Sequence, residues 1–220
     1  MDSRRVRAPR AAQRHQAPTV GLVVEGQTEF IAFPKLHRLN LVPGCPPLKP
    51  SNLNGVGEDL SAIGLAKRVL PKVVAHQVAG RSRVIVCFDR ERRLQAAIDL
   101  QSTVAAELAR LLTLKGRSAG GVFVVVADRA FEAWLLAGAG GLAARRLFRR
   151  LPPFMCFEGE LGAREHLGVE ELTALLGRAY KKTRDGPDLF EAIDFVEARR
   201  HGSGRRGSAS LDAFLRAVGV

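Results

Sequence analysis

Residues Thr19–Leu36 read TVGLVVEGQTEFIAFPKL, and this stretch decides the fold that we expect for the 220-residue chain. A run of apolar and β-branched residues with the character of a strand ends at Glu25 and Gly26. Apolar residues at helical spacing follow, at Phe30, Ile31, Phe33 and Leu36. A buried strand that stops at a carboxylate and a glycine before a helix places Glu25 at the carboxyl end of a sheet. Ligands bind at that edge in open α/β folds.

The pattern of strand and helix repeats along the chain. Residues 83–88 and 122–127 are apolar runs that predict strands, and apolar spacing predicts helices over 58–78 and 94–114. We expect Pro71 to kink or split the first of these helices. Prolines between Leu41 and Asn54 confine any strand there to a short or edge position. The predicted fold is α/β, with a central, mostly parallel sheet flanked by helices and a helical C-terminal third.

Composition divides the chain into three parts. Residues 1–18 are rich in arginine, lack apolar periodicity and are predicted to form a disordered basic arm. Residues 19–140 form the predicted α/β core. Residues 141–220 form a predicted helical C-terminal extension packed on this core, and its clearest helices span 167–176 and 189–196.

Positive charge is the strongest compositional signal, with a formal net charge of +12 and an isoelectric point near 10.7. Such a balance favours salt-sensitive attraction to nucleic-acid phosphates. The arginines that we expect to bind nucleic acid lie in the arm and in a Gly-Ser loop: Arg4, Arg5, Arg7, Arg10, Arg205 and Arg206. The alternative interpretation is a solvated basic surface that reflects a GC-rich genome, with the arm as a harmless tail or a mispredicted start.

The sequence gives no sign of a membrane or secreted protein. No apolar run approaches the roughly 18 residues of a membrane span, and the N-terminus has no secretory signal. Cys45, Cys87 and Cys156 are widely separated and lack metal-ligand spacing. We therefore expect a cytoplasmic protein with reduced thiols, in which Cys87 is buried within its strand.

Acidic residues follow the ends of two predicted strands. The topology brings Glu25, Asp89 and Glu91 together, because parallel strands end on one edge. Carboxylates within about 4 Å repel in pairs by roughly 4 kcal/mol at an effective dielectric constant near 20. Oxygen-only ligands suit Mg²⁺ or Mn²⁺, which would activate water for attack on a phosphodiester. We expect these three residues to be metal ligands and, together with Lys181, catalytic residues.

Other residues are expected to support this site. Glu29 lies one turn into the helix and is expected to orient its neighbours, while Arg90 or Lys181 stabilises the transition state. Glu132 adds a further acid. Alternatives stay open, because Glu25 is also placed to interact with the N-terminus of the next helix. Asp128 reads as a helix cap, and Trp134 as a core residue.

Five segments carry a resemblance to a known family. They are Val24–Glu29 (VEGQTE), Val84–Glu91 (VIVCFDRE), Phe131–Leu136 (FEAWLL), Tyr180–Lys182 (YKK) and Leu211–Leu215 (LDAFL). The first two resemble motifs of TOPRIM domains, the catalytic module of topoisomerases, DnaG-type primases and OLD-family nucleases. The combination, from Thr19 to the C-terminus, is similar to a family of small, stand-alone TOPRIM-like bacterial proteins, often encoded beside an ABC or SMC-type ATPase.

The resemblance implies a Rossmann-like TOPRIM fold and a Mg²⁺-dependent nuclease that acts on DNA or RNA. It also implies that the protein is the effector of a bacterial anti-phage defence system and is regulated by an ATPase partner. Whether the protein forms a homodimer is left open. Glu132 matches an acidic position of the family. Glu91 departs from the usual Asp-x-Asp pattern, which leaves open whether a second metal ion is held.

Two other functions compete with the nuclease. The first is a non-catalytic TOPRIM-fold subunit that binds nucleic acid or the ATPase, and the altered Asp89-Arg90-Glu91 motif favours it slightly. The second is an ordinary nucleotide-binding α/β domain, which the missing glycine-rich phosphate loop argues against. The histidines show no ligand spacing, so a zinc site is unsupported. Topoisomerase activity is not expected, because Tyr180 is the only tyrosine and the chain is too short for a strand-passage domain.

Overall fold

The computed structural model describes residues 18–57, 60–150, 158, 167–202 and 207–220. Within this part of the chain, four parallel strands form one sheet in the order β2-β1-β3-β4: β1 (Val20–Val24), β2 (Leu48–Asn52), β3 (Val84–Asp89) and β4 (Val122–Ala127). The α/β prediction is confirmed, and the architecture is consistent with a Rossmann-like fold. Seven residues discussed above lie outside the described residues: Arg4, Arg5, Arg7, Arg10, Cys156, Arg205 and Arg206.

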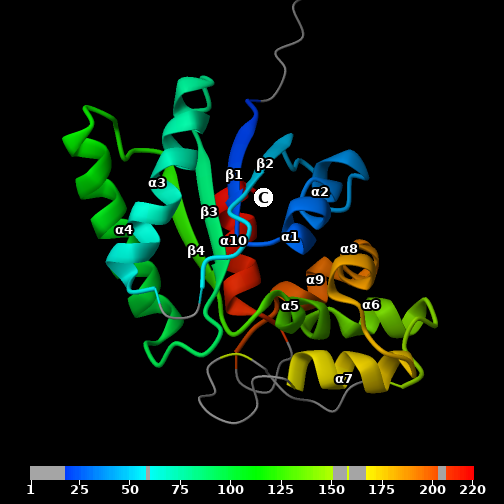
Figure 1. Cartoon of the computed structure of the whole chain (residues 1–220). Coiled ribbons are helices and arrows are strands. Elements are labelled where there is room, and N and C mark those ends of the chain that lie inside the picture. Colours follow the sequence, from blue (N-terminus) through cyan, green and yellow to red (C-terminus); the bar gives the residue numbers. More distant parts are fainter. Residues whose placement is uncertain (1–17, 58–59, 151–157, 159–166, 203–206) are drawn as a thin grey trace, which may run out of the picture.

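Helices cover both faces of the sheet (Figure 1). One face packs against α3 (Ala62–Val78) and α4 (Ala97–Leu114) through an apolar cluster that includes Val23 and Val86. The other face, with Leu22 and Ile85, packs in a second cluster with α1 (Gln27–Ala32), α5 (Phe131–Ala137), α8 (Lys182–Ala192) and α10 (Ala209–Val218). The remaining helices are α2 (Lys35–Arg38), α6 (Ala139–Ala144), α7 (Leu167–Leu176) and α9 (Phe195–Arg199).

An aromatic cluster joins the first and last thirds of the chain. The ring of Phe33 lies 4.5 Å from Phe214, 5.6 Å from Phe190, 5.7 Å from Trp134 and 5.9 Å from Phe131, measured between centroids. Each such pair adds about 0.5–1.5 kcal/mol to the stabilisation from burial. Trp134 is fully buried, as predicted, and the cluster fixes α5, α8 and α10 against the helix that follows β1.

Some of the helix boundaries in the structure differ from those that the sequence pattern predicted. Pro71 does not split the helix, because α3 runs as one helix from Ala62 to Val78 with this proline inside it. The helix expected over 189–196 is instead two helices, α8 and α9, with a break at Ile193 and Asp194. The edge strand is confirmed, since β2 contains Pro50 and lies at one end of the sheet.

Membrane and cysteine predictions can be compared with the described residues. None of the described helices has the length and apolar character needed to cross a membrane. Cys45 and Cys87 are buried free thiols, and burial raises the pKa of both. Cys87 is therefore an inert residue of the core, as its position in the β3 strand predicted.

Candidate acidic site at the carboxyl edge of the sheet

Glu25 follows β1 and is held by two backbone amides, one at the end of β3 and one in the loop after β2. Its Oε1 accepts a hydrogen bond from the Val56 amide at 3.3 Å, and its Oε2 accepts one from the Asp89 amide at 3.1 Å. Glu25 does not cap α1, because Gly26 is the N-cap residue and no side chain caps this end. The carboxylate therefore connects the ends of β1 and β3 with the loop after β2.

Asp89 is the last residue of β3, and its side chain is directed by the start of α5. Its Oδ1 accepts a hydrogen bond from the Phe131 amide at 3.1 Å, and the residue is 5% exposed. Burial raises the pKa of Asp89 well above its usual range; Lys182 opposes this shift, and the nearby carboxylates of Glu29, Glu132 and Glu25 add to it. Buried Asp89 therefore favours a proton or a cation as its partner.

Glu29 and Glu132 bring two more carboxylates to the same place. Both are almost fully buried, with 5% and 2% exposure. Glu132 Oε1 accepts a hydrogen bond from the Tyr180 hydroxyl at 3.3 Å. In contrast, Glu29 Oε2 has no hydrogen-bond partner among the described residues, and burial is the main cause of the raised pKa of Glu29. An unpartnered buried carboxylate oxygen points to a missing cation or proton.

The lysine at this site is Lys182 and not Lys181, the residue that the sequence led us to expect. Its Nζ lies 3.7 Å from Asp89 Oδ2 and 3.7 Å from Glu132 Oε2. Burial by itself lowers the pKa of Lys182, but the carboxylates, led by Asp89 and Glu132, outweigh burial and raise it. Lys181 is the N-cap of α8 and is exposed, with its amide donating to Asp185 Oδ2 at 2.8 Å. The Tyr180–Lys182 segment correctly indicated a lysine near the acidic residues, but its sequence did not show which of the two lysines reaches them.

The segment after β3 directs its side chains away from the predicted arrangement. Arg90 is buried, and its Nε lies 2.9 Å from Asp128 Oδ1. Asp128 therefore pairs with an arginine instead of capping α5, whose N-cap is Ala130. Glu91 has a left-handed backbone with φ of 50°, and its amide donates to the Arg129 carbonyl at 2.8 Å. It contributes to the field at Lys182, after Asp89, Glu132 and Glu29.

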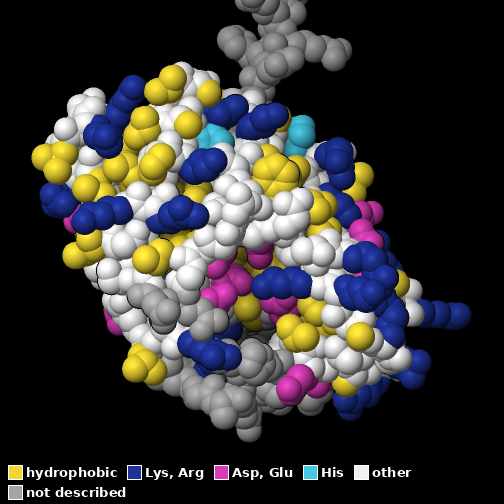
Figure 2. Space-filling view, in the orientation of Figure 1, with side chains coloured by type: hydrophobic (Ala, Val, Ile, Leu, Met, Phe, Trp, Pro, Cys, Tyr) yellow, Lys and Arg dark blue, Asp and Glu magenta, His cyan; other side chains and the backbone are white. Residues whose placement is uncertain are grey.

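The acidic residues offer the oxygen ligands that a hard divalent cation prefers, but they are not positioned in the structure to bind one ion together. Among the described residues, no three acidic, histidine or cysteine side chains lie close enough to hold one ion, so the predicted ligand set of Glu25, Asp89 and Glu91 is not assembled. The donors are all oxygen, and one of them, Glu29 Oε2, lacks a partner. In Figure 2, Asp and Glu side chains gather around a hollow near the centre of this face, with a basic side chain across it.

Comparisons with known proteins add no further support. No family model matches the chain, and neither a curated protein nor a solved structure matches it. The similarity to TOPRIM-like proteins therefore rests on the sequence motifs. The fold and the acidic edge define the chain as an α/β protein with a candidate ligand site at the carboxyl ends of parallel strands.

Proposed function

We propose that the chain is a Mg²⁺- or Mn²⁺-dependent nuclease that hydrolyses phosphodiester bonds of DNA or RNA. The observation that supports this best is the gathering of carboxylates: Asp89, Glu132 and Glu29 act on the ammonium group of Lys182, and Glu25 lies close enough to raise the pKa of Glu29 and Asp89. The ammonium of Lys182 does not offset the burial and mutual repulsion of these acids, since the pKa values of Asp89 and Glu29 stay raised. Such a charge excess favours uptake of a divalent ion or of protons.

The residues that would hold the ion are Asp89, Glu25 and Glu29. A bound Mg²⁺ supplies a Lewis acid that polarises a phosphodiester and lowers the pKa of bound water. Side chains have to turn for this purpose, because the described carboxylates do not converge on one point. Turning Glu29 toward an ion would break no hydrogen bond of its Oε2, since this oxygen has no partner among the described residues.

The chain's own groups have separate roles in this proposal. Lys182 is 47% exposed, so its ammonium reaches solvent and neutralises charge on a phosphate oxygen. Tyr180 donates to Glu132 and keeps this carboxylate beside Lys182. The amides of Val56 and Asp89 fix Glu25 at the edge of the sheet.

Basic residues beside the acidic hollow support nucleic acid as the partner. The segment that leads into α8 exposes Arg178 and Lys181, and the first turn of α8 exposes Arg184. Figure 2 shows Lys and Arg side chains along the adjoining surface. Phosphates attracted by this basic surface would lie next to the carboxylates. Regulation by an ATPase partner and a role in phage defence rest on the resemblance and stay predictions.

The test is cleavage of single-stranded DNA, double-stranded DNA and total tRNA with Mg²⁺ or Mn²⁺, against EDTA. We expect cleavage that requires metal and falls at least about 100-fold in Asp89→Asn and Lys182→Met, because each removes a group at the reacting phosphate. Lys181→Met is the matched control: it removes the same charge from the basic surface but not from the acids, and should lower cleavage far less than Lys182→Met does. Metal-dependent cleavage that survives both Asp89→Asn and Lys182→Met would show that the site is elsewhere.

A non-catalytic nucleic-acid-binding or ATPase-binding subunit is the second candidate. The observation in its favour is that Lys182 already contacts two of the acids while no three described groups assemble around an ion. This function predicts salt-sensitive binding of nucleic acid without cleavage in any metal. Binding in that case would be equal in wild type and Asp89→Asn.

A further inference from the structure

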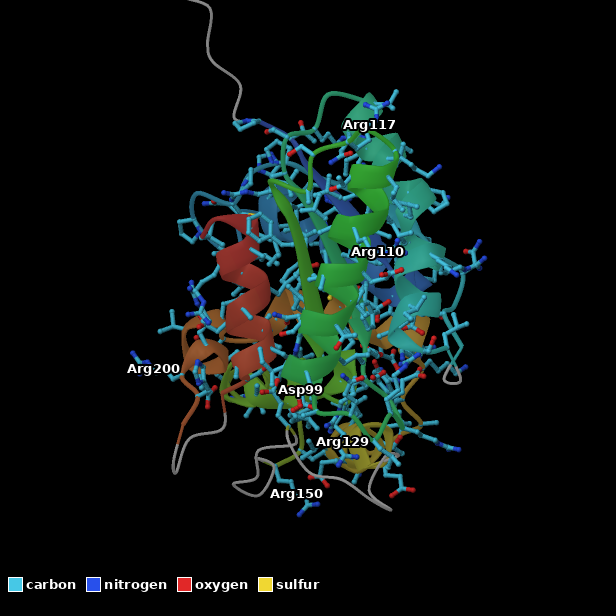
Figure 3. All side chains as sticks on the ribbon, turned by 90° about the vertical axis from the view of Figure 1, so that its left-hand side faces the viewer. Asp99, Arg110, Arg117, Arg129, Arg150 and Arg200 are labelled. Atoms are coloured by element: carbon cyan, nitrogen blue, oxygen red, sulfur yellow. The ribbon has the colours of Figure 1, made fainter. Side chains whose placement is uncertain are left out.

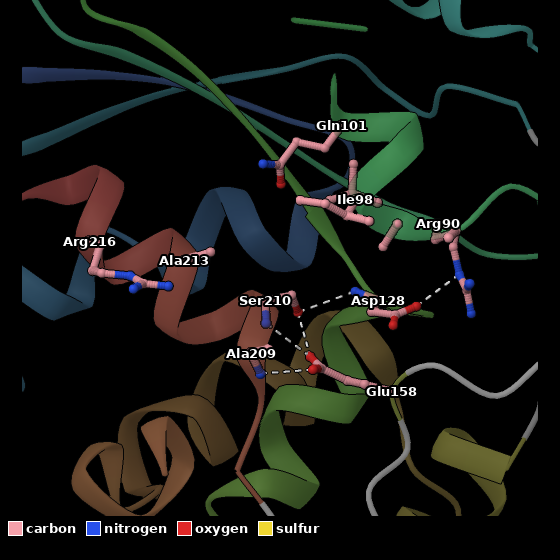
Figure 4. A pocket seen from close by; sticks show the side chains of 12 residues that line it. Arg90, Ile98, Gln101, Asp128, Glu158, Ala209, Ser210, Ala213 and Arg216 are labelled. Carbon is pink, nitrogen blue, oxygen red and sulfur yellow. Dashed lines mark hydrogen bonds and ion pairs between the residues drawn. The ribbon is translucent and has the colours of Figure 1, made fainter. Parts of the chain in front are cut away.

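A cavity of about 370 Å³ lies along the outer edge of β4. Its floor is Val126, which belongs to the apolar cluster on the α3–α4 face of the sheet. One wall comes from α4 and the other from α10, a helix that packs on the opposite face (Figure 4). The cavity therefore extends around the edge strand, and its volume falls in the range of small-molecule sites, about 300–1,000 Å³.

Small apolar side chains shape the cavity as a slot. Ala97 and Ile98 on α4 and Ala213 on α10 line the cavity, and Figure 4 shows Ile98 and Ala213 on its two sides. Ile98 is 64% exposed, which places it at the mouth of the slot. Two opposed apolar walls over a flat strand suit a flat, weakly polar body, such as an aromatic ring.

Three of the charged groups in the cavity, Arg90, Asp128 and Glu158, already have partners within the protein. Arg90 and Asp128 form their ion pair at 2.9 Å. The Glu158 carboxylate accepts hydrogen bonds from the Ala209 amide at 2.8 Å and from the Ser210 hydroxyl at 2.6 Å, at the start of α10. Asp128 and Glu158 therefore have partners within the protein, and neither carboxylate needs a cationic ligand.

Arg216 and Gln101 are the groups that remain available. The Arg216 side chain is 64% exposed and lies 3.2 Å from Asp212, which Arg199 also holds at 2.9 Å. A surface pair of this kind is worth only about 0–1 kcal/mol. The Gln101 amide makes no hydrogen bond within the described part of the chain. Figure 4 shows both side chains extending from opposite walls toward each other.

We infer that this cavity is a second ligand site, which binds an aromatic or heteroaromatic ring carrying one anionic group, as in a nucleoside monophosphate. The ring lies between α4 and α10, Arg216 binds the anion, and Gln101 donates to an acceptor on it. The site does not depend on the proposed nuclease activity. The same chemistry is found in a free nucleotide and in the 5′-phosphorylated end of a nucleic acid.

The site is linked to the acidic edge through the chain itself. Arg90 lines the cavity and directly follows Asp89, whose carboxylate belongs to the acidic site. A ligand beside the Arg90–Asp128 pair therefore contacts the segment that positions Asp89. Binding in the cavity should change the metal affinity of the acidic site, and metal should change ligand affinity by the same factor.

The single tryptophan provides a reporter that does not need activity. Trp134 Nε1 donates to Ser210 Oγ at 2.7 Å, and Ser210 lines the cavity. We would titrate the full chain in EDTA with AMP, UMP, adenosine, inorganic phosphate and a 5′-phosphorylated trinucleotide. Tryptophan fluorescence and calorimetry give the dissociation constants.

We expect saturable binding of the mononucleotides and at least about tenfold weaker binding of adenosine and of phosphate alone, because each lacks half of the recognised chemistry. Arg216→Gln should weaken AMP binding by about tenfold or more. Ala213→Phe should abolish it by filling the slot. Arg110→Gln is the matched control, since Arg110 is an exposed arginine on α4 with its own partner, Glu107, and lies outside the cavity (Figure 3).

Three results would overturn the inference. They are the absence of saturable mononucleotide binding by both methods, equal binding of phosphate alone, and affinity that neither cavity variant changes. If Ala213→Phe lowers the melting temperature, the exposed Arg216→Gln still carries the test. Tighter binding of the trinucleotide would identify a nucleic-acid end as the ligand, and tighter binding of AMP or UMP a free nucleotide; either supports the site.

Discussion

Replacing Lys182 with methionine tests the charge balance of the acidic site without substrate or metal. Its Nζ lies 3.7 Å from a carboxylate oxygen of Asp89 and 3.7 Å from one of Glu132. Coulomb's law gives each pair about 1 kcal/mol in water and about 4.5 kcal/mol at an effective dielectric constant of 20. The Lys182 side chain is 47% exposed, so solvent screening moves the value toward the lower bound, to roughly 1–2 kcal/mol per pair.

The two pairs together make us expect Lys182→Met to lose about 2–4 kcal/mol of unfolding free energy at pH 8 in EDTA, which corresponds to a fall of roughly 5–15 °C in melting temperature for a chain of this size. The loss should shrink toward pH 5. Burial already raises the pKa of Asp89, and without the ammonium this carboxyl takes up a proton instead of staying charged and unpaired. The pH dependence separates a charge effect from a packing effect.

Urea denaturation followed by circular dichroism at pH 5, 6.5 and 8 provides the measurement. Lys181→Met is the control, because it removes the same charge one position earlier, where the side chain is exposed. Equal stabilities of the two variants at every pH, or a loss in Lys182→Met that grows as the pH falls, would refute the electrostatic reasoning.

Three further predictions concern the site and the sheet. Burial raises the pKa of Glu29 in the folded protein, so its charged form increasingly destabilises the fold as the pH rises above the pKa of this carboxyl in the unfolded chain. The stability of Glu29→Gln relative to wild type should therefore increase from pH 5 to pH 8. A difference in urea denaturation that stays constant over this range would contradict the prediction. Binding of Mg²⁺ at pH 7 should release protons from Asp89 and Glu29, seen as calorimetric enthalpies that differ between buffers of different ionisation enthalpy; identical enthalpies would count against it. Gly121 has φ of 80°, and a Cβ added to it would lie 2.1 Å from the Ser82 carbonyl oxygen. Gly121→Ala should therefore lower the free energy of unfolding by at least about 2 kcal/mol. The control Gly120→Ala should leave the melting temperature nearly unchanged.

Sequence patterns were sufficient where the physical signal is local. The apolar runs that became β1, β3 and β4 alternate between two buried faces, and burial on both faces requires such a composition. Parallel connections then place the residue after each strand on one edge, which is why Glu25 and Asp89 were predicted to converge. Their neighbours were harder to assign, because Glu91 turns into a left-handed conformation that its side chain does not signal.

The start of α8 shows the limit of local reasoning. Gly186 and Pro187 argue against a helix, yet both are buried within α8. The helix is held by distant contacts, since the buried ammonium of Lys35 donates to the Pro187 carbonyl at 3.1 Å and to Glu191 at 3.0 Å. These contacts override local propensity, and a short sequence window does not contain them.

By itself, the sequence determined the parallel sheet, its acidic edge and the two carboxylates that end β1 and β3, because hydrophobic period and chain connectivity are encoded locally. Tertiary structure alone decided that Lys182, and not Lys181, reaches Asp89 and Glu132, because that choice depends on how α8 docks against α1. It also decided the pairing of Arg90 with Asp128 and the cavity between α4 and α10. Side-chain direction and the space between helices are set by packing between segments that are far apart in the chain.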